Sequence, residues 1–188
     1  HGTPFKWTTD ETNLSTAQKN LLNLKSDGTS DALGQDRLNY VRGDRTKEGT
    51  ESPPDYPAAK PFRERKSRQG SIVNSEVWYV GAPSSNYVWK GYAAFTRAHK
   101  SRLPMIYVGG NDGMLHAFES DTGKEIFAFI PSTVIQNLNK LSGQNYKGGE
   151  HRYFVDGSPI VRDVYFDNTL GWRTVLIGTL RAGGKAMF

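Results

Sequence analysis

The chain has 188 residues, a formal net charge of +5 and no cysteine. The lack of cysteine excludes thiol catalysis, cysteine-ligated zinc and disulfide bonds, while 36% hydrophobic and 12% aromatic residues are typical of a folded globular protein. Twenty glycines and nine prolines, together with many aromatic residues, favour short strands and tight turns over a helical bundle. Because we find neither a long apolar stretch nor a leader sequence, we expect any export signal to lie outside this chain.

Residues 1–66 are predicted to form a helical and loop lead-in with a connector. Ser15 and Gln18 have the spacing of a capping box, and the leucines that follow predict a helix over about 15–24. A second short helix is predicted through residues 37–41, with Gly43 as its C-cap residue. Residues 44–61 contain four of the nine prolines and almost no aliphatic side chains, which predicts a mobile connector.

The segment 60–68, KPFRERKSR, holds five basic residues against one glutamate. Such a stretch can bind phosphate groups, but it contains one aromatic residue and follows the connector. A solvated face or a guard for an exposed strand edge is the favoured interpretation, and no nucleic-acid partner is expected.

Residues 67–188 show a strand-and-turn pattern, in which short β-branched and aromatic runs end at Gly, Pro, Asn or Asp. Strands are predicted at about 71–80, 105–109, 114–119, 125–130, 152–155, 159–166 and 173–178. Two helical insertions are predicted, one over 92–98 and one after Pro131 and Ser132. The whole region is therefore expected to be mainly β.

Two pairs of segments in this region share a plan. MIYVGGNDGMLHAF (105–118) is similar to TVLIGTLRAGGKAMF (174–188), and GSIVNSEVWYVG (70–81) is similar to GSPIVRDVYF (157–166). The order of the two plans is the same in both copies, which indicates a repeated unit of four antiparallel strands, as in a propeller blade. The fold class predicted is a partial β-propeller of about one and a half quinoprotein-like blades, and an independent closed fold is the alternative.

Several residues are predicted to have turn roles in this region. Asp112-Gly113 predicts a type I′ hairpin turn, and Thr122-Gly123 is expected to act similarly before the fourth strand. Asp156-Gly157 precedes a proline-containing turn, where a carboxylate most often accepts from backbone N–H groups.

Five long segments resemble the PilC/PilY family of type IV pilus proteins, and the resemblance runs almost from end to end. They are LNYVRGDRTKEG (38–49), FRERKSRQGSIVNSEVWYVGAP (62–83), YVGGNDGMLHAFESDTGKEIFAFIPS (107–132), HRYFVDGSPIVRDVYF (151–166) and WRTVLIGTLRAGGKAMF (172–188). The chain is similar to the opening of that family's C-terminal propeller.

The resemblance implies a pilus biogenesis and tip-associated adhesion factor that supports assembly and twitching motility, counters retraction and is no enzyme. It also implies a location at the pilus tip or outer membrane, with minor pilins and a host-cell receptor as candidate partners. Some members of the family bind calcium through an acidic propeller loop. We find no such loop in the chain, so calcium binding is an expectation for the full-length protein and not for these residues.

No residue set predicts catalysis or a resident metal. His99, His116 and His151 are not at metal-ligand spacing, and Asp27 and Asp31 are expected to be turn residues. Arg42-Gly43-Asp44 spells the integrin-binding tripeptide, which makes it a candidate receptor site. The need for glycine after a helix already explains Gly43, and this structural interpretation is favoured.

Two other functional classes remain open from the sequence. TGKEIF and DGMLHAF also resemble blades of quinoprotein dehydrogenases, which hold pyrroloquinoline quinone and calcium. Against this alternative, the chain lacks vicinal cysteines, and Phe127 stands where those repeats usually carry Trp. The third class is a propeller scaffold of outer-membrane assembly.

Overall fold

The computed structural model describes residues 2–49 and 60–188, which fall into two compact units. The first unit contains the described residues up to Ser71 together with 111–113 and 130–154. The second contains 72–110, 114–129 and 155–188. Much of the connector predicted at 44–61 lies outside the described residues, and the division between residues 66 and 67 stays a prediction.

The first helix, α1 (Thr16–Leu22), begins where the capping box predicts. The Ser15 hydroxyl accepts from the Gln18 amide at 3.3 Å, and the Gln18 side chain accepts from the Ser15 amide at 2.9 Å. These two bonds satisfy backbone donors that have no partner within a first helical turn. The helix ends at Asn23, slightly before the predicted limit.

The second helix, α2 (Gly34–Val41), begins three residues before the predicted start. It ends at Val41 with Arg42 as its C-cap, and the next residue, Gly43, has a φ of +104°, the left-handed conformation that glycine adopts without strain. The Gly43 amide donates to the Tyr40 carbonyl, and the Asp44 amide donates to the Asn39 carbonyl, both at 2.9 Å. This pair of bonds is the Schellman arrangement, so the predicted glycine stop is confirmed.

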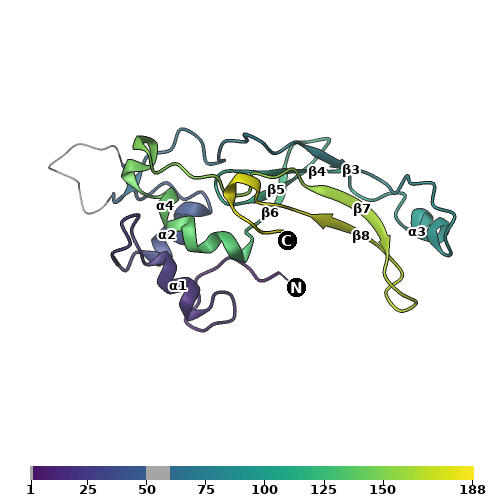
Figure 1. Cartoon of the computed structure of the whole chain (residues 1–188), viewed down its shortest axis with the longest axis horizontal. Coiled ribbons are helices and arrows are strands. Elements are labelled where there is room, and N and C mark those ends of the chain that lie inside the picture. The colour runs from purple at the N-terminus through teal and green to yellow at the C-terminus, as the bar shows by residue number, and fades with distance from the viewer. Residues whose placement is uncertain (1, 50–59) are drawn as a thin grey trace. The chain divides into compact units, whose positions relative to one another are not determined.

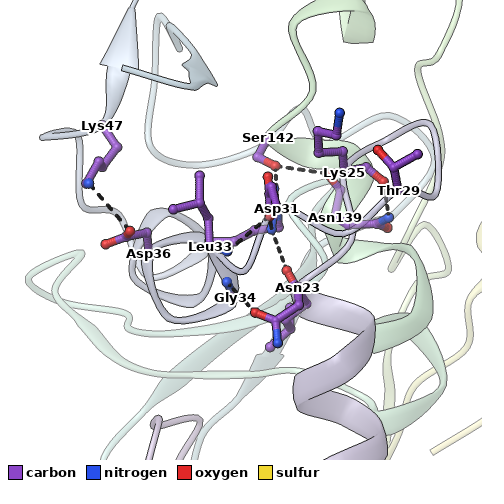
Figure 2. A network of polar contacts seen from close by, with 12 residues as sticks. Asn23, Lys25, Thr29, Asp31, Leu33, Gly34, Asp36, Lys47, Asn139 and Ser142 are labelled. Carbon is purple, nitrogen blue, oxygen red and sulfur yellow. Dashed lines mark hydrogen bonds and ion pairs between the residues drawn. The ribbon is translucent and has the colours of Figure 1, made fainter. Parts of the chain in front are cut away.

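The guanidinium of Arg37 on α2 is buried among the helices of the first unit. It donates to the Asp31 carboxylate at 2.7 Å, to the Ser142 hydroxyl at 2.8 Å and to the Leu22 carbonyl. Figure 2 shows the surrounding contacts, including those that the Asn23 backbone and side chain make with Asp31 and Gly34. These bonds tie α1, α2 and the turn at Ser142 together, because a buried cation must have its donors satisfied.

The rest of the first unit is short and irregular. It contains the 3₁₀ helices η1 (Ser132–Asn137) and η2 (Gln144–Gly148), the helix α4 (Leu138–Leu141), and the parallel pair β1 (Glu48–Gly49) and β2 (Phe62–Arg63). Figure 1 shows α1, α2 and α4 close together. The helical insertion predicted after Pro131 is confirmed, since η1 and α4 bury Val134, Ile135 and Leu138.

The second unit is built on antiparallel strands. β3 (Trp78–Val80), β4 (Met105–Gly109), β5 (Leu115–Glu119) and β6 (Glu125–Phe129) form one sheet in chain order, and β7 (Ile160–Tyr165) pairs with β8 (Trp172–Ile177). Figure 1 shows this sheet and the β7-β8 hairpin. The helix α3 (Tyr92–Ala98) and the 3₁₀ turn η3 (Arg181–Gly183) complete the unit. Among residues 2–49 and 60–188 no sheet closes on itself.

Two predicted strands are wrong in part or whole. The strand predicted at 71–80 is formed only over β3, because the Asn74 and Glu76 amides donate to the side chains of Asp156 and Ser158 instead of to a neighbouring strand. No strand forms at 152–155, where the Phe154 amide donates to the side chain of Asn111. At both places, backbone amides donate to side-chain oxygens and not to the carbonyls of a neighbouring strand.

After β8 the chain makes two backbone contacts at the position of the third strand predicted for the second copy. The Gly178 and Phe188 backbones exchange two hydrogen bonds of 2.9 and 3.0 Å, and Thr179 bridges Met187. In both copies the glycine at the end of the second strand therefore pairs with a residue beyond the following turn, Gly109 with Leu115 and Gly178 with Phe188.

The type I′ turn predicted at Asp112-Gly113 is not formed. The connection between β4 and β5 has the five residues 110–114, and the Gly110 amide donates to the Met114 carbonyl at 2.8 Å. Gly113 has a φ of +94°, whereas Asp112 is not among the residues with positive φ. A type I′ turn needs positive φ at both central positions, so the longer loop takes its place.

The segment 155–158, which we call the crossing segment, joins the strands of the second unit. The Val155 amide donates to the Gly110 carbonyl at 3.4 Å, and the Gly157 amide donates to the Thr179 carbonyl at 3.1 Å. The buried Asp156 carboxylate accepts from the Asn74 side-chain amide at 2.7 Å and from the Asn74 backbone at 3.3 Å. One short segment thus contacts the lead into β3, the end of β4 and the end of β8.

Gly157 leaves no room for a side chain. A Cβ at this position would lie 2.5 Å from the carbonyl oxygen of Thr179 and would overlap the Thr179 hydroxyl. We expect Gly157→Ala to lower the free energy of unfolding by about 3 kcal/mol, because backbone atoms must move to admit the methyl group. Urea unfolding followed by circular dichroism measures this change.

Gly2→Ala is the matched control, since nothing lies within 4 Å of a Cβ at Gly2. Equal midpoints for the two variants would contradict the close approach at the crossing segment.

Candidate functional site

The tripeptide Arg42-Gly43-Asp44 lies at the C-terminal end of α2, where the backbone follows the Schellman arrangement described above. The Arg42 guanidinium donates to the Phe5 carbonyl at 3.2 Å. The Asp44 carboxylate accepts from the Thr46 amide at 2.7 Å, and this hydrogen bond holds the pKa of Asp44 below its usual range. Both charged side chains are exposed, but they extend from a helix end with a fixed backbone.

Two arginines of the basic segment satisfy the carbonyls at this helix end. Arg65 donates to the Tyr40 carbonyl at 2.8 Å and to the Asp44 carbonyl at 2.9 Å, and Arg68 donates to the Gly43 carbonyl at 3.0 Å. The last carbonyls of a helix lack helical partners and carry the negative end of the helix dipole. The backbone of the tripeptide is therefore stabilised by cations from the segment 60–68.

Arg65 is held in place by the buried carboxylate of Glu48. Their side chains are 7% and 4% exposed, and the Arg65 Nη2 lies 2.6 Å from the Glu48 Oε1. Glu48 also accepts from the Arg65 amide and from Arg45. Burial alone would raise the pKa of Glu48, but the hydrogen bonds from Arg65 and Arg45 outweigh it, so the pKa is lowered.

The ring of Tyr40 packs against Arg65 of this pair, and its hydroxyl is buried. The hydroxyl donates to the Leu141 carbonyl at 3.2 Å, and the Arg65 guanidinium lies 3.7 Å from the ring centroid. Burial raises the pKa of Tyr40 to about 12. The group around the tripeptide is thus a closed set of ion pairs and hydrogen bonds, in which we identify no nucleophile or general base.

The predicted turn residues lie in three loops. Asp112 and Gly113 lie between β4 and β5, Thr122 and Gly123 between β5 and β6, and Asp156 and Gly157 in the crossing segment. Gly123 has a φ of +69°, and its amide donates to the Glu119 carbonyl at 2.9 Å. Asp112 accepts from the Gly70 amide at 2.6 Å. The structure brings these six residues to separate places, and their roles beyond the turns stay predictions.

Within residues 2–49 and 60–188 no group of three His, Asp or Glu side chains is arranged to hold a metal ion. His99 contacts Phe95, His116 pairs with Glu125 at 2.6 Å, and His151 contacts two tyrosines. Asp27 accepts from the Thr29 amide and hydroxyl, which lower the pKa of Asp27 to about 2. In the same part of the chain we find no helix with the length and apolar character needed to cross a membrane.

The sheet of the second unit exposes apolar residues that the strand pattern of the sequence does not predict to be exposed. Every residue of β6 is exposed, including Ile126, Phe127 and Phe129 on its two faces. Trp89 in the loop before α3 and Tyr79 on β3 are also exposed. Alternation in β6 cannot reveal this feature, because both faces are apolar and neither is buried.

A family model described as the PilY1 β-propeller domain matches residues 69–188. The chain is 44% identical over 189 residues to the type IV pilus biogenesis factor PilY1 of Pseudomonas aeruginosa strain PAK, covering 93% of the chain and 15% of that relative. It is 44% identical over 173 residues to a PilY1 homolog of Xylella fastidiosa, covering 88% of the chain and 13% of that relative. The chain thus spans about a seventh of the length of these relatives, and no solved structure matches it.

The Glu48–Arg65 pair makes stability depend on pH. We expect Glu48→Gln to cost about 3 kcal/mol at pH 7, because it leaves a buried guanidinium without its anion. The folded-state pKa of Glu48 is lowered, so the stabilisation is present above the unfolded pKa of about 4.3 and is lost as the pH falls through the folded pKa. Thermal melts from pH 7 to pH 3 should show the gap between wild type and variant closing below about pH 4.

Glu64→Gln is the control, because Glu64 is an exposed neighbour in the same segment. A gap that stays constant down to pH 3 would contradict the role of the Glu48 carboxylate.

Proposed function

Because this chain belongs to the family of the PilY1 β-propeller domain, we propose that it is the opening part of a propeller in a type IV pilus biogenesis factor. The single observation that carries the proposal is the family match over residues 69–188, joined by relatives that are 44% identical and named as pilus biogenesis factors. The location that follows is at the cell surface and associated with the pilus.

The strand arrangement supports the propeller. The sheet β3-β4-β5-β6 is antiparallel and in chain order, which is the arrangement of one blade. The hairpin β7-β8 and the contacts of Gly178 with Phe188 repeat its first part. Since each blade of a propeller is covered by its neighbours, the exposed faces of β6 are the surfaces that further blades would cover.

The role we propose is that of a structural and binding module. It supports pilus assembly, counters retraction and promotes attachment, with minor pilins of the tip complex as partners and the pilus tip or outer membrane as its place. The names of the relatives describe a biogenesis factor and not an enzyme, which fits a module without catalytic activity. The same names favour this role over a quinone-dependent dehydrogenase or a scaffold of outer-membrane assembly.

Pilus assembly is the first test, made with the whole protein in the bacterium that encodes it. We expect Gly157→Ala to reduce the pili recovered by shearing cells by at least tenfold, because the crossing segment cannot admit the methyl group. If pili return when the motor that retracts them is also deleted, the result would support the proposal that the protein counters pilus retraction. Normal piliation with a variant shown to unfold in vitro would contradict the proposal.

Receptor binding by Arg42-Gly43-Asp44 stays a prediction, and the geometry favours a structural role for the tripeptide. Asp44→Asn keeps an oxygen that can accept from the Thr46 amide but removes the carboxylate that an integrin would need. We expect this variant to leave pilus number and attachment to integrin-bearing cells unchanged, as measured by counting adherent bacteria. A fall in attachment at normal pilus number would instead establish the tripeptide as a receptor site.

A further inference from the structure

A cavity of about 490 Å³ lies within the first unit, and the predicted sites leave it unexplained. Its buried lining includes Tyr40, Val41, Leu141 and Tyr146, so part of its wall is apolar. A volume of this size lies in the range of about 300–1,000 Å³ that is usual for ligand pockets.

The lining of the cavity is strongly basic. Among the described residues that line it, five are Lys or Arg, namely Arg63, Arg65, Lys66, Arg68 and Lys147, and Asp112 is the one carboxylate. The two most buried cations are already used, since Arg65 pairs with Glu48 and Arg63 donates to the Leu141 carbonyl. Lys66 and Lys147 are exposed and have no ion-pair or hydrogen-bond partner in the described part of the chain. They remain available to an anion.

Asn111 gives the cavity a buried donor without an acceptor. The residue is 4% exposed, and its Oδ1 accepts from the Phe154 amide at 3.1 Å. Its Nδ2 has no hydrogen-bond partner among the described residues. A buried donor left unpaired is costly, and Asn111 is among the residues that line the cavity, so a ligand oxygen that reaches its Nδ2 would relieve that cost.

We propose that this cavity binds an acidic peptide segment of a partner protein. An apolar side chain of the peptide would pack against Val41 and Leu141, while its carboxylates would pair with Lys66 and Lys147. An oxygen of the peptide would accept from the Nδ2 of Asn111. This inference goes beyond the propeller and its pilus role and does not rest on them, because it follows from the charge and the unpaired donor of the first unit alone.

A nucleic acid fits the same charge less well. Sequence-tolerant binding of single strands needs aromatic faces on which bases stack. The faces of both tyrosines in the lining are taken by arginines, since the Arg65 guanidinium lies 3.7 Å from the Tyr40 centroid and that of Arg63 lies 4.3 Å from the Tyr146 centroid. A peptide carboxylate needs only donors, which the lysines and Asn111 supply.

Fluorescence polarisation of the 188-residue chain with a labelled hexapeptide of alternating glutamate and leucine tests the proposal. The same peptide with glutamine in place of glutamate is the ligand control. We expect the acidic peptide to bind at least tenfold more tightly than its control. The double variant Lys66→Gln with Lys147→Gln should weaken it at least tenfold, whereas Lys100→Gln, an exposed lysine outside the cavity, should not.

Asn111→Asp is the sharper variant, because it keeps the acceptor for the Phe154 amide and replaces the donor Nδ2 by an oxygen. It should also abolish binding, and thermal melts establish that each variant is folded. Equal binding of the two peptides, or undiminished binding by the folded double-lysine variant, would overturn the proposal. Displacement of the peptide by a short single-stranded DNA at lower concentration would overturn it in favour of a nucleic-acid site.

Discussion

The hydrogen bonds of the buried Asp156 carboxylate are the interactions on which the second unit most depends. The carboxylate accepts hydrogen bonds from the backbone amide and the side-chain amide of Asn74, and the next residue, Gly157, lies against the Thr179 backbone. A buried anion is stable only when its oxygens are hydrogen-bonded, and a glycine allows two backbones to approach within the width of a side chain. Together they join segments of the second unit that are far apart in the sequence.

The same approach of backbones occurs where the first copy of the repeat ends its second strand. A Cβ at Gly109 would overlap the Val155 carbonyl, and the Gly109 amide donates to the Ser75 hydroxyl at 2.9 Å. In the second copy the corresponding Gly178 lies against the Phe188 ring. Both copies therefore have a glycine at the corresponding point, but the neighbour is a backbone carbonyl at Gly109 and the end of an aromatic side chain at Gly178.

The first unit is held by buried arginines rather than by an extended sheet. Arg37 joins the helices through Asp31 and Ser142, and Arg65 joins the end of α2 to Glu48. Charged pairs of this kind need nearly complete hydrogen bonding to be stable. The buried basic residues of the segment 60–68 thus stabilise the fold, and its exposed basic residues contribute positive charge to the cavity.

Elements with strong local signals could be predicted from the sequence. The capping box at Ser15, the glycine stop at Gly43 and the strands β4 to β8 all follow from spacing and turn chemistry. The predictions were wrong where a distant side chain replaces a strand partner, as at Asn74 and at Phe154, because such acceptors are brought near only by the fold. The cavity was missed for the same reason, since Asn111 and Lys147 are far apart in the sequence.

The propeller proposed above requires further strands at the outer edge of the β7-β8 hairpin. The Gly178 amide bonds to Phe188 on the side of β8 away from β7, so the amides of Leu176 and Thr174 face the same open edge. Hydrogen exchange of these two amides, measured in the 188-residue chain and in the full-length protein, tests this requirement. We expect rapid exchange in the chain and at least a hundredfold slower exchange in the full-length protein. Equally rapid exchange in both would contradict it.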